Sequence, residues 1–396
     1  MLEGHPVPGY RARSVPRRLI ALTTSVAVLV LLYSLVTGAA TMDAQGIPVF
    51  ANPPPRLGSC QPVRLPVTLP GGQDAWLAGH LCTPAHSHPR TVLMLAPGGT
   101  YNSAYWSWPV DPDFYSFTWQ ALADGGFAVF AVDRLGTGQS SHPPSTLDTF
   151  TAQGYTLHQA VARLRAGTVG HTRYQHVILI GHSFGSAEIA QELHDYPADA
   201  DAVIFTGSGH AVSAETTGLT HTGFAPAVTL LPRDAGRDPG YVTSTTQQVR
   251  DQLLYRTVDS ARAVRVFDQA TRDLLAVREA STRPSDLSTL TAGLRIPTLL
   301  LDGQDDSHYC NGAQLVPETG LDDCATATDL YHSEQAHYGP CFAAAIVPGS
   351  GHDLTTEFGA RTAATLILRY ARTVLPPGAT RARCTVTGPV STGRGD

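Results

Sequence analysis

Short, almost continuous apolar runs alternate with longer amphipathic stretches along most of the chain. Apolar runs occupy 91–97, 127–133, 176–182, 202–207, 298–303 and 342–349. Continuous runs of this length are typical of parallel strands that helices cover on both faces. The stretches between and after them predict helices near 114–124, 156–165, 186–195 and 355–374. Because strands alternate with helices, the pattern predicts an α/β fold with a doubly wound, mostly parallel sheet.

Two further segments extend this pattern. Residues 63–69 and 75–82 predict two strands joined at Pro70-Gly71-Gly72, which we expect to form an antiparallel edge of the sheet. The long interval 208–296, after the sixth strand, has helical patterns near 244–255 and 260–278. Since a structureless loop of that length is uncommon, we expect a helical lid over the carboxyl edge of the sheet, where ligands of open α/β sheets bind.

The chain ends differ in character from the region between them. Residues 1–18 are basic and 19–40 are uncharged and mostly apolar, which is typical of a signal peptide or an N-terminal membrane anchor. A Pro-rich linker is expected at 41–62, a single α/β domain at 63–375 and a tail at 376–396. We therefore expect an exported protein, either secreted or anchored to the outer face of the cytoplasmic membrane, with cleavage of the first segment left open.

The cysteine pattern agrees with export. The chain has six cysteines, an even number that suggests disulfides in an oxidising compartment. We expect Cys60–Cys82 across the first strand pair and Cys310–Cys324 within one loop, which leaves Cys341 and Cys384. Because no Cys-x-x-Cys pair lies near histidines, no metal site is expected from the cysteines.

Charge excludes one large class of partner. The chain carries 33 acidic and 27 basic residues and a formal net charge of −6. Outside the N-terminus no basic stripe is present, so nucleic-acid binding is not expected.

The most informative motif is Gly181-His182-Ser183-Phe184-Gly185. It fits Gly-x-Ser-x-Gly, and it lies between an apolar run and a helical stretch, as a nucleophile elbow requires. A tight structural turn is the alternative reading. The elbow would expose Ser183 at the carboxyl edge of the sheet, beside a helix N-terminus whose field favours an oxyanion.

A serine needs a base, and the base an acid, in the chain order Ser, Asp or Glu, His. The end of the run at 298–303 and the segment after it offer Asp302, Asp305 and Asp306. The segment after the last run offers His352, between Gly351 and Asp353. Both follow strands at the same edge of the predicted sheet as the serine.

With these motifs the chain resembles the α/β-hydrolase superfamily across about 63–375, as a secreted esterase- or lipase-like member. The family's acid lies in a Gly-x-x-Asp loop after the penultimate strand, which implies Asp306, with Asp305 as the alternative. Asp302 lies before that glycine, in the strand. The motif 133–140, which resembles a loop-shaping segment of the family, implies structural roles for Asp133 and Arg134.

The resemblance also implies an oxyanion hole. The family's oxyanion loop, often His-Gly-x, reads Pro97-Gly98-Gly99 here. Because backbone N–H groups hold the oxyanion, the proline leaves that role intact. The amides of Phe184 and Gly99 are expected to serve, with Thr100 as the alternative to Gly99.

These expectations combine into a function. We expect a serine hydrolase that cleaves a carboxylic ester or related acyl bond through a Ser183–His352–Asp306 triad and an acyl-enzyme, without cofactor or metal. Its substrate would be a small-molecule or lipid-like ester. A lactonase, thioesterase or acyltransferase could use the same triad, and a non-catalytic ligand-binding relative is the alternative from another class. The sequence selects neither the acyl chain nor the oligomeric state.

Overall fold

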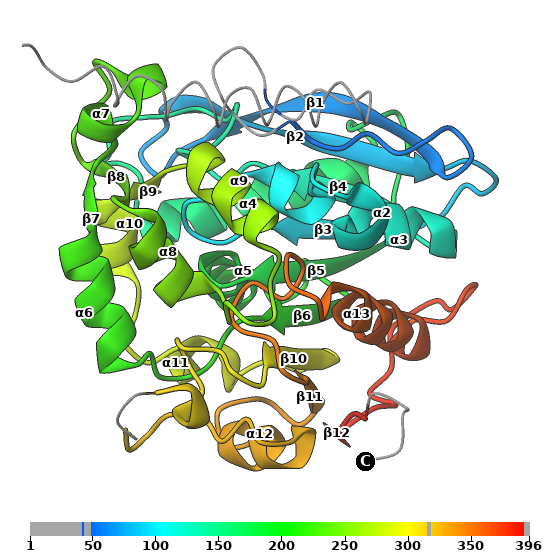
Figure 1. Cartoon of the computed structure of the whole chain (residues 1–396). Helices are drawn as coiled ribbons and strands as arrows, with labels where there is room; N and C mark the ends of the chain where they lie inside the picture. The colour runs from blue at the N-terminus through cyan, green and yellow to red at the C-terminus, as the bar shows by residue number, and fades with distance from the viewer. Residues whose placement is uncertain (1–41, 43–48, 315–317, 392–396) are drawn as a thin grey trace, which may run out of the picture. The chain divides into compact units, whose positions relative to one another are not determined.

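The computed structural model describes Met42, residues 49–314 and residues 318–391. Within them, nine strands form one sheet in the order β1-β2-β4-β3-β5-β6-β10-β11-β12 (Figure 1). Their bounds are β1 (Gly58–Thr68), β2 (Asp74–Pro84), β3 (Thr91–Ala96), β4 (Ala128–Val132), β5 (His176–His182), β6 (Ala202–Thr206), β10 (Thr298–Gly303), β11 (Phe342–Val347) and β12 (Gly388–Pro389). Strands β3 to β12 of this sheet are parallel, and β2 is antiparallel to β1 and β4. The predicted mostly parallel sheet with an antiparallel edge is confirmed.

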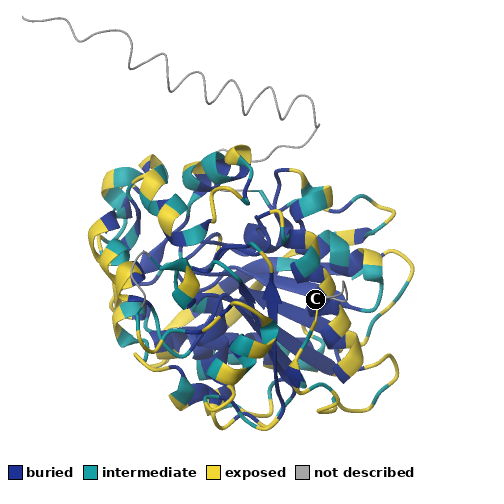
Figure 2. Cartoon of the chain, turned by 60° about the horizontal axis from the view of Figure 1, so that its bottom comes forward, coloured by how far each residue is buried: buried dark blue, intermediate teal, exposed yellow. Residues whose placement is uncertain are grey.

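Helices cover both faces of the sheet, whose strands are buried (Figure 2). Their bounds are η1 (Ser103–Ser107), α2 (Pro112–Tyr115), α3 (Phe117–Asp124), α4 (Phe150–Ala166), α5 (Phe184–Asp195), η3 (Asn311–Ala313), α12 (Ala327–Glu334) and α13 (Ala360–Val374). In β5, Val177 and Leu179 pack with α4 and α5, whereas Ile178 and Ile180 pack with α3 and α13. Successive side chains of a strand point to opposite faces of the sheet, and helices cover both faces here. Consecutive positions are therefore mostly apolar, which explains the continuous apolar runs in the sequence.

The segment between β6 and β10 contains helices and a small sheet. Its elements are α6 (Ala214–Gly223), β7 (Phe224–Pro226), α7 (Ala227–Leu230), η2 (Pro232–Asp234), β8 (Tyr241–Ser244), α8 (Gln247–Leu254), α9 (Arg262–Thr271), β9 (Leu275–Ala276), α10 (Val277–Thr282) and α11 (Ser288–Thr291). Strands β7, β8 and β9 pair antiparallel. The insertion contains helices, as expected, together with the short strands β7, β8 and β9. Strands of two to four residues are too short to give a period-two pattern, so the sequence did not reveal them.

The main sheet includes residues outside 63–375 at both ends. Strand β1 begins at Gly58 rather than at residue 63, because Cys60 and Cys82 are cross-strand partners and the pairing runs on to Gly58 and Pro84. The expected tail contains β12, which pairs with β11. Cys384 attaches this tail to Cys341. Residues 58–62 and part of the tail therefore belong to the α/β domain.

Three disulfides form as predicted, joining Cys60 to Cys82, Cys310 to Cys324, and Cys341 to Cys384. They are consistent with an oxidising, extracellular environment.

The expected signal peptide or anchor at 1–40 lies outside the described residues. Among the residues that the structure describes, no helix has the length and apolar character needed to cross a membrane.

The Cys310–Cys324 bond should contribute measurably to stability. It closes a loop with a sequence separation of 14 residues. The Cys310→Ser/Cys324→Ser double variant should lower the free energy of unfolding by about 3 kcal/mol, because the unfolded chain gains conformational entropy. Urea unfolding of the two proteins measures the difference, and peptide mapping without reduction checks all three pairs. Free thiols at these positions in the denatured, unreduced protein would contradict the assignment.

Candidate active site

Ser183 occupies a sharp turn between β5 and α5. Its backbone has φ 52° and ψ −119°, a conformation that a non-glycine residue adopts rarely. The flanking glycines permit close packing of this turn. A Cβ on Gly181 would lie 2.4 Å from Ser186 Cα, and one on Gly185 would lie 2.4 Å from the Ala96 carbonyl oxygen. The motif is thus a strained strand–turn–helix, which is the nucleophile-elbow geometry.

Asp306 and His352 meet at the same edge of the sheet, in the loops after β10 and β11. His352 Nδ1 lies 2.8 Å from Asp306 Oδ2, and neither side chain is exposed. Asp306 also accepts a hydrogen bond from the His308 backbone N–H at 2.7 Å. The alternative acid, Asp305, instead pairs with Arg256 at 3.1 Å near the surface. The structure therefore brings Asp306, not Asp305, to the histidine.

Burial and charge set the protonation of this pair. Burial lowers the pKa of His352, but the charge of Asp306 and its hydrogen bond outweigh burial and raise the pKa above 6.5. Burial raises the pKa of Asp306, yet the charge of His352 holds it below the usual value. With Nδ1 donating to Asp306, the lone pair of His352 is on Nε2. That atom is buried and forms no hydrogen bond with any described residue.

A second buried pair joins the loops that carry Ser183 and His352. His182 Nε2 lies 2.9 Å from Asp353 Oδ1, with no exposed surface on either side chain. The His182 and His352 rings lie 4.8 Å apart, centroid to centroid. The residue before the serine is thus hydrogen-bonded to the residue after the histidine. Sequence reasoning missed this pair, although both members adjoin predicted site residues.

Hydrogen bonds extend from this pair into the inserted segment. The Tyr101 hydroxyl contacts Asp353 and lies 3.0 Å from Asp268 Oδ2 in α9. Asp268 binds Arg250 of α8 through two contacts of 2.6 and 2.8 Å. Arg250 Nη1 in turn donates to Thr100 Oγ1 at 2.8 Å. The inserted segment is therefore bonded to both the histidine loop and the loop after β3.

The loop after β3 presents Gly99 to the start of α5. A Cβ on Gly99 would lie 3.1 Å from the Phe184 ring and 3.5 Å from Leu275 Cδ1. The Thr100 N–H already donates to the Leu274 carbonyl at 3.2 Å. Because that donor is engaged, Gly99 is the better candidate of the two for an oxyanion donor.

Arg134 forms a hydrogen bond with the loop after β3. It is fully buried, contacts Glu188 of α5 and lies 2.6 Å from Glu279 of α10. It also donates to the Gly98 carbonyl at 3.2 Å. The neighbouring Asp133 accepts backbone N–H groups at 2.8 and 2.9 Å. Both side chains have the structural contacts that the sequence predicted.

The site is nearly closed. Ser183 is 9% exposed and His352 is not exposed. The His308 ring stacks parallel on the His352 ring, with 3.8 Å between ring centroids and 6° between ring planes.

Asp306, His308 and His352 lie close enough to suggest a metal site. However, nitrogen lone pairs lie in the ring plane, so two parallel stacked rings cannot both direct one to a common ion.

A second group of metal-compatible donors comprises His210, Asp322 and Glu334. It lies behind the loop of Asp306 and outside the Ser183 site. No signal in the sequence pointed to it.

Comparisons with known proteins agree with this architecture. A model of the alpha/beta hydrolase family matches residues 92–365 of the chain. No curated protein sequence matches it. A thermophilic esterase from Thermogutta terrifontis is 19% identical, with a TM-score of 0.54, over 78% of this chain and 98% of the esterase. Carboxylesterase CesB from Bacillus subtilis is 14% identical, with a TM-score of 0.52, over 79% and 91%.

A bacterial membrane phospholipase A has a similar fold, with 17% identity and a TM-score of 0.53 over 90% of this chain and 98% of the phospholipase. At these identities the structural matches show a shared fold. The family match covers most of the chain and spans the strands that position Ser183, Asp306 and His352. The chain therefore belongs to the alpha/beta hydrolase family.

Proposed function

We propose that this hydrolase cleaves a carboxylic ester or related acyl bond through an acyl-enzyme, with Ser183 as nucleophile, His352 as base and Asp306 as acid. The observation that carries the proposal is the 2.8 Å contact of His352 Nδ1 with Asp306. It leaves Nε2 as the basic atom, and the adjoining His182–Asp353 pair ties the His352 loop to the turn that bears Ser183.

In this mechanism His352 Nε2 takes the Ser183 proton as Oγ attacks the substrate carbonyl. The N–H groups of Gly99 and Phe184 hold the resulting oxyanion. Asp306 keeps the His352 tautomer and stabilises the imidazolium. His352 then protonates the departing alcohol, and water, activated by the same imidazole, releases the acid and restores Ser183.

Further observations bear on the substrate, on its access to the site and on the compartment in which the enzyme acts. The similar structures named above include an esterase and a carboxylesterase. The near closure of the site suggests that the inserted segment acts as a lid, which must yield to admit substrate. The disulfides and the basic, then apolar, N-terminus support action outside the cytoplasm.

Replacement of the nucleophile tests the proposal first. Ser183→Ala should lower kcat on p-nitrophenyl esters by about 10⁵–10⁶-fold, because no other group can form the acyl-enzyme. Ser59→Ala, at an exposed position on β1, is the matched control and should retain wild-type rates. Rates measured over esters, lactones and thioesters of graded length identify the substrate class. A Ser183→Ala protein with wild-type turnover would refute the mechanism, and an inactive wild type would favour the ligand-binding alternative.

The pH profile tests the acid and the base together. Since neutral His352 is the base and its pKa lies above 6.5, kcat/KM should fall as the pH drops through a value above 6.5. Asp306→Asn should reduce kcat by about 10⁴-fold. It should also move the acidic limb to lower pH, because burial continues to lower the pKa of His352 without the opposing charge. An acidic limb that stays in place in Asp306→Asn would argue against this pairing.

The His182–Asp353 pair should position the site rather than merely stabilise the fold. His182→Ala should lower kcat by about 10²-fold with a smaller change in KM, because it releases the loops of Ser183 and His352. His176→Ala is a matched control, since His176 bonds Asp201 at 2.9 Å at the opposite end of the same strand. Equal kcat losses in the two variants would assign His182 a purely structural role.

A further inference from the structure

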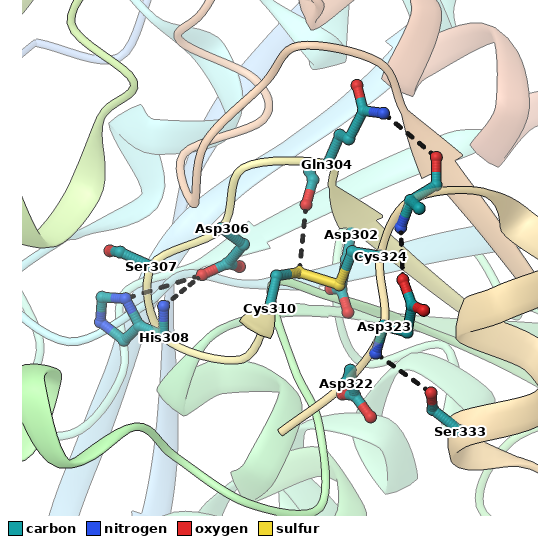
Figure 3. Close-up of a disulfide and its surroundings, with 12 residues drawn as sticks. Asp302, Gln304, Asp306, Ser307, His308, Cys310, Asp322, Asp323, Cys324 and Ser333 are labelled. Atoms are coloured by element: carbon teal, nitrogen blue, oxygen red, sulfur yellow. Dashed lines mark hydrogen bonds and ion pairs between the residues drawn. A yellow bond between two sulfur atoms is a disulfide. The ribbon is translucent and has the colours of Figure 1, made fainter. Parts of the chain in front are cut away.

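A polar cluster lies behind the loop that carries Asp306. His210 follows β6, Glu334 ends α12, and Asp322 lies two residues before Cys324. Asp302 lies in β10. Figure 3 draws it and Asp322 next to the Cys310–Cys324 disulfide. Asp302 and Glu334 have no exposed surface, and Asp322 is 1% exposed.

Three of these side chains converge on one small volume. His210 Nδ1 lies 2.7 Å from Glu334 Oε1 and 3.6 Å from Asp322 Oδ1. Their ligand atoms all lie within 4.8 Å of one another. A Cβ on Gly209 would lie 2.6 Å from Asp322 Oδ2 and 3.3 Å from Glu334 Oε1, so both carboxylates face the same point of the backbone.

The cluster has more buried oxygen atoms than hydrogen-bond donors. When these carboxyl groups are ionised, both oxygens of Asp322, Oε2 of Glu334 and Oδ2 of Asp302 have no hydrogen-bond donor among the described residues. Within the described residues, the ion-pair partner of Asp322 and Glu334 is His210. Buried carboxylates normally need a cation or a proton to remain there.

A shared proton and a bound cation would satisfy different numbers of the unpaired oxygens. One proton between Asp322 and Glu334 would satisfy two of their three unpaired oxygens. A cation can bind all three. An imidazole nitrogen together with carboxylate oxygens suits Zn²⁺ or a similar transition metal better than Ca²⁺, which prefers oxygen alone.

We propose that His210, Asp322 and Glu334 bind a divalent transition-metal cation of the Zn²⁺ type. Ligands about 2.0–2.1 Å from a tetrahedral zinc lie about 3.3 Å apart. The 3.6 Å separation of His210 Nδ1 from Asp322 Oδ1 is close to that value. The 2.7 Å separation of His210 Nδ1 from Glu334 Oε1 is a hydrogen bond, which metal binding would replace. The three ligands take no part in the proposed esterase chemistry. The cysteine pattern did not predict this site, because its ligands are not cysteines.

The bound cation would hold the acid loop in place. The Asp322 N–H donates to the Tyr309 carbonyl at 2.8 Å, and the Asn311 N–H donates to the Asp322 carbonyl at 2.8 Å. Asp322 is thus bonded to the segment that follows Asp306. Through the cation, this segment is attached to the end of β6 and to α12.

Metal binding is measured directly on the full-length protein. After EDTA treatment and equilibrium dialysis against ZnCl₂, MnCl₂ or CaCl₂, elemental analysis should find one equivalent of Zn²⁺ in the wild type, with Ca²⁺ the weakest of the three ions. Zn²⁺ at 100-fold excess over Kd should raise Tm by about 3–6 °C. The affinity should fall with decreasing pH, since His210 must lose a proton to bind.

Isosteric variants separate the cation from the proton. Glu334→Gln and Asp322→Asn should weaken Zn²⁺ binding at least tenfold and abolish the Tm shift. Asp323→Asn, at the adjacent exposed residue, is the matched control and should bind as the wild type does. Wild-type protein that binds none of the three ions, with a Tm unaffected by EDTA, would overturn the proposal even if a variant fails to fold. In that case a shared proton holds the cluster.

Discussion

The hydrogen bond between His352 Nδ1 and Asp306 is the interaction on which the proposed chemistry depends. It orients the imidazole, directs its lone pair to Nε2 and raises the pKa of His352 against the effect of burial. Two loops far apart in the sequence must meet for this bond to form. The parallel arrangement of β10 and β11 makes that possible, because both strands end at the same edge of the sheet. The disulfide loop and the inserted segment both form hydrogen bonds with the segments that carry this pair.

Much of this arrangement could be predicted from the sequence, since the relevant signals are local. The apolar runs that became β3, β5, β10 and β11 are buried on both faces and therefore lack polar interruptions. The glycines around Ser183 mark a turn that leaves no room for a Cβ. The order of strands along the chain then indicated that Asp306 and His352 lie at the edge where Ser183 lies. Two cysteine pairs followed from their strand and loop positions, and the third consists of the two cysteines that remained.

What could not be predicted depends on contacts between distant segments. Strands β7 and β9 have no pattern of their own and exist because β8 pairs with both. In the tail, β12 has two residues, which only β11 and the bond to Cys341 reveal. His182 and Asp353 come from distant segments, and only the folded structure shows that they form a pair beside Ser183 and His352. The donors His210, Asp322 and Glu334 come from three segments without a shared motif, so only the folded chain assembles them.

Fluorophosphonate labelling of the native protein tests whether Ser183 is activated, because the probe reacts with a serine only where a neighbouring base activates it. We expect a single adduct on the peptide that contains Ser183, absent after heat denaturation and strongly reduced in His352→Ala. An adduct on another serine, or none in folded wild-type protein, would contradict the assignment of Ser183 as an activated nucleophile.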